Sequence, residues 1–431
     1  MLNIPKKLNS FKNFVCELSL AQTTHNKKDR DIFGEIPPFS LSLCKLNVMK
    51  DIIKLLLAFI VILILPQQAQ SQIKAKCNIY QFEYPIMLPA TPVKNQAITG
   101  TCWSYSTTSF FESELMRMGK GKYNLSEMYT VRMNYINRVN DNYLKQGKGN
   151  LGEGSLSNMM LNVINEYGMV PREVYNGINY NSKTHDHTEL NAFIQAIAAV
   201  PVSLKQRSAQ FYKLLNSLLD IYLGVVPEKF NYNKKEYTPI SFFQSLGVNT
   251  EDYILLTSFS HHPFYSNFVL EIPDNWNGGC YYNLPLDQFM QVIDNALKTG
   301  YTVCWDGDMS EKSYSDPIGI AVMPTEQELN SEPGQKLLFN RIYKEETVTQ
   351  QSRQKGFENF TTTDDHLMHL IGSATDKNGT LYYVVKNSWK PETNRFGGYN
   401  HLSTEYVKAK TISIIVHKNA IPQAILNKLQ L

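Results

Sequence analysis

The sequence has few cysteines, little net charge and almost no long apolar runs. None of its six cysteines belongs to a Cys-x-x-Cys pair or to a Cys/His cluster with zinc spacing, so we predict no structural metal. The net charge of +3 over 431 residues is not concentrated in any segment, which argues against nucleic acid as a partner. No internal repeat or low-complexity tract is present. What remains is an ordinary globular composition, 43% hydrophobic, with enough chain for a large core.

The exception is an apolar run at residues 55–65. At about 1.5 Å per residue in a helix, this run is shorter than a hydrocarbon core of roughly 30 Å. Lysines precede it and Ala69-x-Ser71 follows it, which is the pattern of a secretory signal peptide cleaved after Ser71. We therefore predict that 49–71 is a signal peptide, that the protein is exported to the periplasm or the extracellular space, and that it has no stable membrane insertion after cleavage. An uncleaved anchor is the alternative.

The signal peptide sits unusually far from the start, because residues 1–48 precede it. This segment mixes lysine, asparagine, serine and proline without periodicity. Our interpretation is an over-extended start, with translation beginning at Met49, or else a disordered tail. Four cysteines then remain in the mature chain, and the sequence does not decide whether Cys77, Cys280 or Cys304 form a disulfide.

Residues 72–431 are predicted to form one α+β domain, because expected helices come first and expected strands later. Such an order favours a helical lobe packed against a β-rich lobe. Helices are expected at 102–118, 125–143, 156–167, 190–199, 211–223 and 286–299, with a polar helical stretch around 336–356. Strands are expected at 253–259, 268–272, 302–306, 319–322, 369–374, 381–386 and 411–417. Residues 72–92 read as an extended surface arm, and 224–250 show no clear pattern.

The chemistry is predicted to centre on Cys102. A polar, glycine-containing loop reaches this cysteine just where an apolar helical pattern begins. The N–H groups and dipole of a helix N-terminus favour a thiolate, so the position suits a nucleophile. Gln96, six residues upstream, could donate its side-chain amide to an oxyanion.

A cysteine nucleophile needs a base and a group that orients the base. His369 begins one late strand, and Asn387 follows the next, with Asn378-Gly379 forming a hairpin turn between them. We expect the two side chains to lie side by side, with the Asn387 amide oxygen accepting from the imidazole and Trp389 shielding that hydrogen bond. His366 is the rival base, but Asp364-Asp365-His366 reads as a solvated loop, so His369 is preferred.

These residues resemble those of papain-like cysteine proteases. The quoted features are Gln96-x5-Cys102-Trp103, a distant histidine and Asn387-Ser388-Trp389. Within that group the chain looks most like the bleomycin hydrolase and aminopeptidase C branch, from Val93-Lys94-Asn95-Gln96 to His417-Lys418 and Ile421-Pro422, including Gly152-Glu153-Gly154-Ser155. The resemblance covers residues 84–425.

The resemblance implies a papain-like two-lobed fold with helical insertions, the stretch 184–250 among them. It implies Cys102 as nucleophile, His369 as base and then acid, Asn387 as orienter and Gln96 as half of the oxyanion hole. It also implies that no cofactor is needed, that peptides are the substrates, and that a homo-oligomer is one assembly to test. A final set of positions is expected at the substrate cleft: Trp103, Glu153, Gly154 and Trp389. Glu153 is a candidate for recognising a substrate amine, with a solvated loop acid as the alternative.

Three departures from the branch are noted: Thr101, Lys390 in place of a glycine, and a short tail of nine residues after Pro422. In the branch a C-terminal tail enters the cleft and limits cleavage to the substrate's N-terminal end. The leading prediction is a secreted cysteine peptidase of the aminopeptidase type acting through a thioester. The alternatives are an endopeptidase, because the tail is short, a catalytically silent peptide-binding protein, and an acyl transferase.

Overall fold

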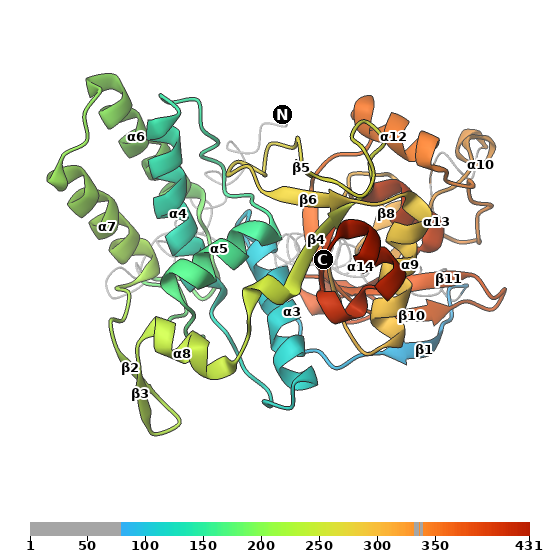
Figure 1. Cartoon of the computed structure of the whole chain (residues 1–431), viewed down its shortest axis with the longest axis horizontal. Coiled ribbons are helices and arrows are strands. Elements are labelled where there is room, and N and C mark those ends of the chain that lie inside the picture. The colour runs from blue at the N-terminus through green and yellow to red at the C-terminus, as the bar shows by residue number, and fades with distance from the viewer. Residues whose placement is uncertain (1–78, 332–335, 337–338) are drawn as a thin grey trace, which may run out of the picture. The chain divides into compact units, whose positions relative to one another are not determined.

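The structure, a computed structural model, describes residues 79–331, 336 and 339–431. These described residues belong to one compact unit. The predicted signal peptide at 49–71, the segment 1–48 and Cys77 lie outside the described residues. The described part has the predicted α+β architecture, with a helical lobe at the left of Figure 1 and a β-rich lobe at the right.

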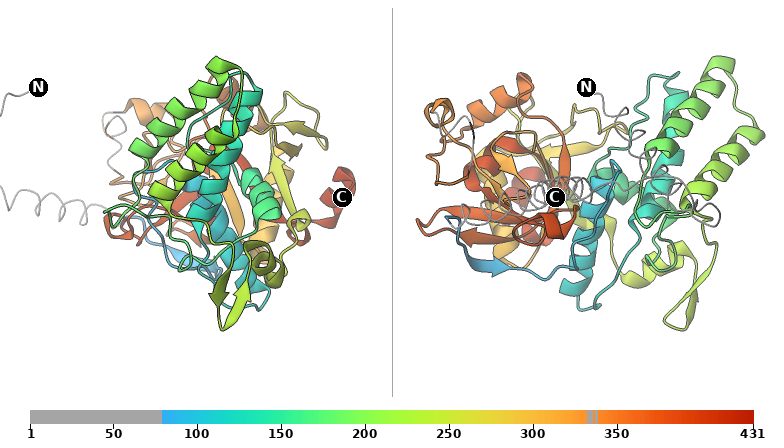
Figure 2. Two further views of the ribbon diagram at one scale, coloured as in Figure 1. Left: turned by 90° about the vertical axis from the view of Figure 1, so that its left-hand side faces the viewer. Right: turned by 180° about the vertical axis from the view of Figure 1, so that it is seen from behind.

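The helical lobe is built from the first half of the described chain. Its members are α3 (Cys102–Arg117), α4 (Glu127–Leu144), α5 (Ser157–Tyr167), α6 (Thr188–Leu204), α7 (Ala209–Leu223), the hairpin β2 (Phe230–Tyr232) and β3 (Lys235–Tyr237), and α8 (Pro239–Leu246). Helices α6 and α7 form the outer edge of this lobe in Figures 1 and 2, where the resemblance predicted inserted material. Serine hydroxyls cap α4 and α7, which fixes where these helices begin.

The β-rich lobe contains one large mixed sheet with strand order β5-β6-β4-β13-β7-β10-β11-β12-β9-β8, and β1 pairs with β10. The strands are β1 (Glu83–Met87), β4 (Tyr253–Thr257), β5 (Asn267–Val269), β6 (Cys280–Asn283), β7 (Val303–Gly307), β8 (Tyr314–Ser315), β9 (Ile320–Ala321), β10 (His366–Thr375), β11 (Leu381–Lys386), β12 (Tyr399–Ser403) and β13 (Thr411–His417). The helices of this lobe are α9 (Leu286–Lys298), α10 (Glu326–Asn330), α12 (Gln350–Glu358), α13 (Thr404–Lys410) and α14 (Gln423–Leu429), with short 3₁₀ turns η1 (Thr250–Asp252), η2 (Pro391–Thr393) and η3 (Lys418–Ala420).

Helix α3 joins the two lobes. Its residues from Cys102 to Leu115 are all buried, so the helix is enclosed on every side and not only along the apolar stripe that the sequence predicts. It packs against β10 and β7 of the sheet on one side and against α4 and α5 on the other. Cys102, the first residue of α3, therefore lies between the helical lobe and the sheet that contains β10 and β11.

The described part of the N-terminal arm is extended and largely exposed, as expected, and it also joins the sheet. Strand β1 pairs antiparallel with β10, with Met87 opposite Gly372. Gly372 permits this contact, because a Cβ there would overlap the carbonyl oxygen of Ile86. At the other end of the chain, α14 buries Ile425 and Leu429 in the core of the β-rich lobe.

None of the helices within the described ranges is both long enough and apolar enough to span a bilayer.

Candidate active site

Cys102 is the first residue of α3, as the sequence predicts, and is 8% exposed. The N-cap residue Thr101 makes no side-chain capping bond, so the first N–H groups of the helix are not covered by a side chain. Burial raises the pKa of the Cys102 thiol to about 12, and a backbone hydrogen bond from Leu367 opposes this in part. The resting side chain is thus a thiol, and the predicted thiolate requires a base that takes its proton.

The candidate base is His366, which lies beside Asn387. The Nε2–H group of His366 donates to Asn387 Oδ1 over 2.7 Å, and the Trp389 ring covers the imidazole with 5.0 Å between ring centroids. Leu367, the next residue, reaches the Cys102 sulfur through its backbone. With its proton on Nε2, His366 keeps the lone pair of Nδ1 for the thiol.

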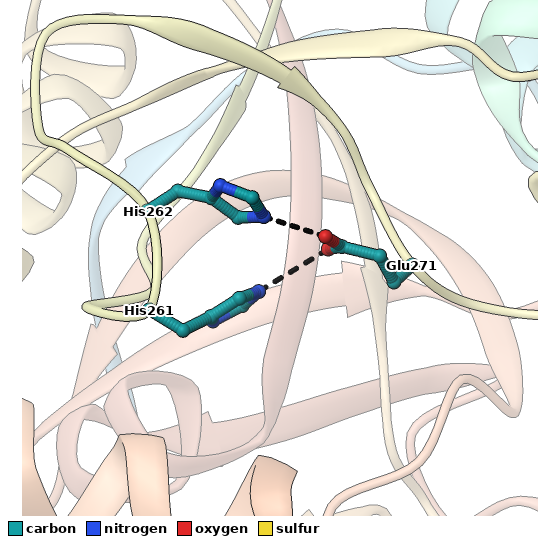
Figure 3. A group of neighbouring side chains, drawn as sticks. All are labelled: His261, His262 and Glu271. Atoms are coloured by element: carbon teal, nitrogen blue, oxygen red, sulfur yellow. Dashed lines mark hydrogen bonds and ion pairs between the residues drawn. The ribbon is translucent and has the colours of Figure 1, made fainter.

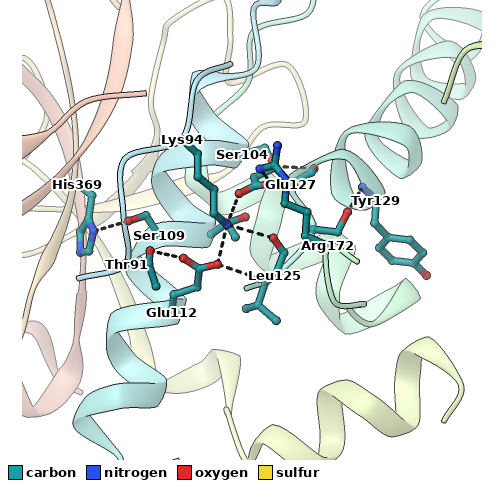
Figure 4. A network of polar contacts seen from close by, with 12 residues as sticks. Thr91, Lys94, Ser104, Ser109, Glu112, Leu125, Glu127, Tyr129, Arg172 and His369 are labelled. Atoms are coloured by element: carbon teal, nitrogen blue, oxygen red, sulfur yellow. Dashed lines mark hydrogen bonds and ion pairs between the residues drawn. The ribbon is translucent and has the colours of Figure 1, made fainter. Parts of the chain in front are cut away.

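The preference for His369 was wrong on this geometry. Strand β10 begins at His366, three residues earlier than expected, and residues three apart on a strand point to opposite faces. His369 lies opposite Lys386 in the sheet, and both side chains reach Ser109 Oγ at 2.8 Å (Figure 4). His369 is therefore part of the polar core between the lobes.

The polar core around His369 is a network of charged and hydroxyl side chains. Lys94 bridges Glu112 and Glu127 at 2.8 and 2.6 Å, and Thr91 donates to Glu112 (Figure 4). Lys386 in turn donates to the Thr91 hydroxyl. Burial and then the charge of Lys386 hold the pKa of His369 well below its usual range. His369 stays neutral and structural.

The orientation of Asn387 is fixed by Asp316, which sequence reasoning missed. Asn387 Nδ2 donates to Asp316 Oδ1 over 2.7 Å, and this contact turns Oδ1 of the amide toward His366. Asn394 and Asn400 donate to the same Asp316 oxygen at 3.3 and 3.0 Å. Asp316 lies in the loop between β8 and β9 and is 7% exposed, and no local motif marks it.

Burial also sets the charge state of the base. It lowers the pKa of His366 to about 4, while the hydrogen bond to Asn387 raises it in part. The imidazole is neutral near pH 7 and can accept a proton from Cys102. The neutral thiol of Cys102 and the neutral, oriented imidazole of His366 are thus the candidate nucleophile and general base.

Gln96 is buried at the loop that precedes α3. Its Oε1 accepts from Ser388 Oγ at 2.6 Å, and its Nε2 donates to Thr99 O at 2.7 Å. The Gln96 backbone N–H also donates to Ser388 O, so the glutamine is tied to the residue after Asn387. An amide nitrogen carries two hydrogens, and the second one remains for a reacting oxygen.

The other expected cleft residues have different surroundings. Trp103 is completely buried and donates its Nε1–H to Glu153 O over 3.1 Å, so it is a packing residue and not a cleft surface. The Glu153 carboxylate accepts from the backbone N–H of Gly100 at 2.7 Å, which ties it to the nucleophile loop. Gly154 lies under Asp274, whose carboxylate a Cβ at Gly154 would overlap.

A group of potential metal ligands is formed by His261, His262 and Glu271 (Figure 3). The hydrogen bonds around it do not fit a metal. Gln354 Oε1 accepts from the Ser260 N–H at 2.6 Å, so its Nε2–H faces His261 Nδ1 at 3.0 Å. Nδ1 of His261 thus accepts and Nε2 carries the proton, which it donates to Glu271 over 3.2 Å. A metal-bound imidazole would need the opposite arrangement.

The described cysteines are free. Cys304 is buried beside Ser106 and Ser157, each with its hydroxyl 3.2 Å from the sulfur, and Cys280 is exposed. The prediction that Cys304 is a buried strand residue is confirmed by its 1% exposure in β7.

Comparisons with known proteins identify relatives of this chain. The profile of the Peptidase C1-like family matches residues 148–431, about two-thirds of the chain. Aminopeptidase G of Lactobacillus delbrueckii subsp. lactis is 24% identical over 376 residues, which cover 77% of this chain and 82% of that protein. Aminopeptidase C of Lactococcus lactis subsp. cremoris is 22% identical over 384 residues, covering 79% and 84%. The crystal structure of PepW from Lactobacillus rhamnosis HN001 matches with a TM-score of 0.63 at 22% identity, covering 84% of this chain and 86% of that one. The chain has the papain-like α+β fold of cysteine peptidases and belongs to the Peptidase C1-like family.

Proposed function

We propose that the protein is a cysteine aminopeptidase that cleaves peptides through a thioester on Cys102. The observation that carries the proposal is the hydrogen bond from His366 to Asn387, which orients the imidazole. His366 is followed directly by Leu367, whose backbone forms a hydrogen bond with the Cys102 sulfur. Buried hydrogen-bonded imidazoles of this kind serve as general bases for cysteine nucleophiles.

In the proposed reaction, His366 Nδ1 takes the proton of the Cys102 thiol as the sulfur attacks a peptide carbonyl. The amide of Gln96 and the Cys102 backbone N–H donate to the oxyanion that forms. His366 then gives its proton to the leaving amine, and the C–N bond breaks to leave a thioester. Water, deprotonated by His366, hydrolyses the thioester and regenerates the thiol.

The aminopeptidase assignment rests on the relatives. Aminopeptidases G and C match over more than three-quarters of this chain and over more than four-fifths of their own length. The endopeptidase alternative came from the short tail after Pro422. In the described residues that tail forms α14, with Lys428 near the Tyr265 hydroxyl and Leu431 bonded back to Leu426.

The test is product analysis of one peptide digested by the wild type and by Cys102→Ala. We expect residues to be released from the N-terminal end by the wild type only, with a thiol-reactive epoxide labelling Cys102. Labelling without cleavage would favour a peptide-binding role, and release of internal fragments would favour an endopeptidase. Equal digestion by both proteins would refute the proposal.

We further propose that the enzyme is exported, on the basis of the signal-peptide pattern at 49–71. The N-terminal sequence of the mature protein tests this. A first residue at Gln72 supports export with cleavage, whereas a mature chain that still contains 55–65 contradicts cleavage.

A further inference from the structure

The loop that lies over Gly154 forms one wall of an acidic cavity beside the nucleophile. The cavity has a volume of about 610 Å³ and lies between residues 271–274 and 357–364, just before His366. Its carboxylates are Glu271, Asp274, Glu358 and Asp364. Among the described residues that line it there is no lysine or arginine. Asp364 and Asp274 are near enough to Cys102 for their charges to act on its thiol.

Two of the four carboxylates already have partners. Glu271 accepts from His261 and His262, and Glu358 accepts from Gln354 Nε2 at 2.9 Å. Their charge is therefore largely satisfied within the cavity wall. The other two carboxyl groups, those of Asp274 and Asp364, have different partners.

Asp364 is paired with another acid. Its carboxyl group shares a hydrogen bond with that of Asp306, which requires a proton on one of them. Asp306 is only 2% exposed, and its Oδ2 accepts from Ser413 at 2.9 Å. No N–H or O–H donor of the described residues reaches Asp306 Oδ1 or Asp364 Oδ2. Burial raises the pKa of both carboxyl groups, and no ion pair of the described residues includes either of them.

Asp274 completes the arrangement from the opposite wall. Asn150 Nδ2 donates to its Oδ1 at 3.2 Å, and its carboxylate lies directly over Gly154. The nearby Arg138 guanidinium donates instead to the carbonyls of Asn150 and Gly152. Asp274 and Asp364 therefore lie on facing walls of the cavity, and neither belongs to an ion pair of the described residues.

We propose that Asp274 and the Asp306–Asp364 pair form the subsite that binds the N-terminal ammonium group of the substrate. An ammonium group offers three N–H donors and one positive charge, which matches a cavity with carboxyl groups on facing walls and no lysine or arginine among its described lining residues. Binding the substrate terminus there places its first residues at Cys102 and restricts cleavage to the N-terminal end. The inference rests on the proposed peptidase function and names what makes it an aminopeptidase. The proposed subsite takes the role that the sequence analysis suggested for Glu153, because the Glu153 carboxylate already accepts a hydrogen bond from the Gly100 N–H.

The experiment compares three fluorogenic substrates: leucyl amide with a free amine, its N-acetyl derivative, and N-acetyl-lysyl-leucyl amide. We expect the wild-type kcat/KM to be at least a hundredfold higher for the free amine than for the N-acetyl derivative. Asp274→Asn and Asp364→Asn should each lower kcat/KM for the free amine tenfold or more and leave the acetylated substrates nearly unchanged. Asp287→Asn, an exposed carboxylate on α9 outside the cavity, is the matched control and should change neither.

The outcomes separate this inference from the proposed function. Equal hydrolysis of free and acetylated leucyl substrates, or equal losses on both in the variants, overturns the ammonium subsite and keeps the peptidase. A wild-type preference for the acetyl-lysyl substrate overturns it in favour of a side-chain subsite. No hydrolysis of any substrate refutes both. If Asp364→Asn does not fold, Asp274→Asn alone decides, because Asp274 is only partly buried.

Discussion

Replacing each of two histidines on one strand gives the sharpest test of the site. His366→Ala and His369→Ala both truncate a buried ring on β10, at 3% and 0% exposure. Each variant loses one side-chain hydrogen bond, to Asn387 at 2.7 Å or to Ser109 at 2.8 Å. A lost hydrogen bond costs about 1 kcal/mol, and the cavity left by a large buried side chain raises the total to about 2–4 kcal/mol. The two variants should therefore lose similar free energy of unfolding.

Their activities should differ sharply. His366→Ala removes the proposed base for the Cys102 thiol, and we expect kcat/KM to fall by roughly 10²–10⁴. His369→Ala should stay within about threefold of the wild type wherever the protein is folded, because His369 lies on the opposite face of the strand. Urea unfolding gives the stability of each variant, and kcat/KM on a free-amine substrate, corrected for the folded fraction, gives the activity. A folded but inactive His369→Ala, together with an active His366→Ala, would refute the assignment.

Other predictions follow from the same site and from the buried histidines. Asp316→Asn should lower kcat about 10–100-fold with little change in KM, because Asn387 loses the charged acceptor worth roughly 1.5–3 kcal/mol that orients its amide; an unchanged kcat would contradict this positioning role. Gln96→Ala should lower kcat and kcat/KM together by roughly 10²–10³, and a change in KM alone would instead indicate ground-state binding. Since burial lowers the pKa of His366 to about 4, the acid limb of kcat/KM should lie nearer pH 4 than pH 6.5, and a midpoint above pH 6 would show that another group controls it. His401 has a pKa of about 4 because it is buried, so as the pH falls from 6.5 the unfolded chain binds its proton first and stability drops by up to about 3 kcal/mol near pH 4. His401→Phe should reduce this acid loss in urea titrations, and an identical loss in both proteins would contradict the expectation.

Several features of the fold were determined by the local sequence. Helix α3 begins at Cys102 because a loop with glycine meets an apolar pattern there, and the start and end of α5, α7 and α9 agree with prediction within a few residues. The β10–β11 hairpin follows from Asn378-Gly379, where Gly379 takes the positive φ that the turn requires. The hairpin β2–β3 and the eight-residue helix α8 were missed, because elements this short carry too little periodicity.

The choice between His366 and His369 was decided only by the tertiary structure. The two histidines are three residues apart on β10 and so point to opposite faces of the strand, and only the packing of that strand decides which of them meets Asn387. Long-range contacts likewise brought Asp316 to Asn387 across 71 residues and Asp274 to the loop of Gly154. The sequence alone identifies Cys102, Gln96 and Asn387 as a peptidase pattern, because their local contexts are specific. The base, its positioning aspartate and the acidic subsite depend on which strand faces and loops meet, and short-range patterns do not contain that information.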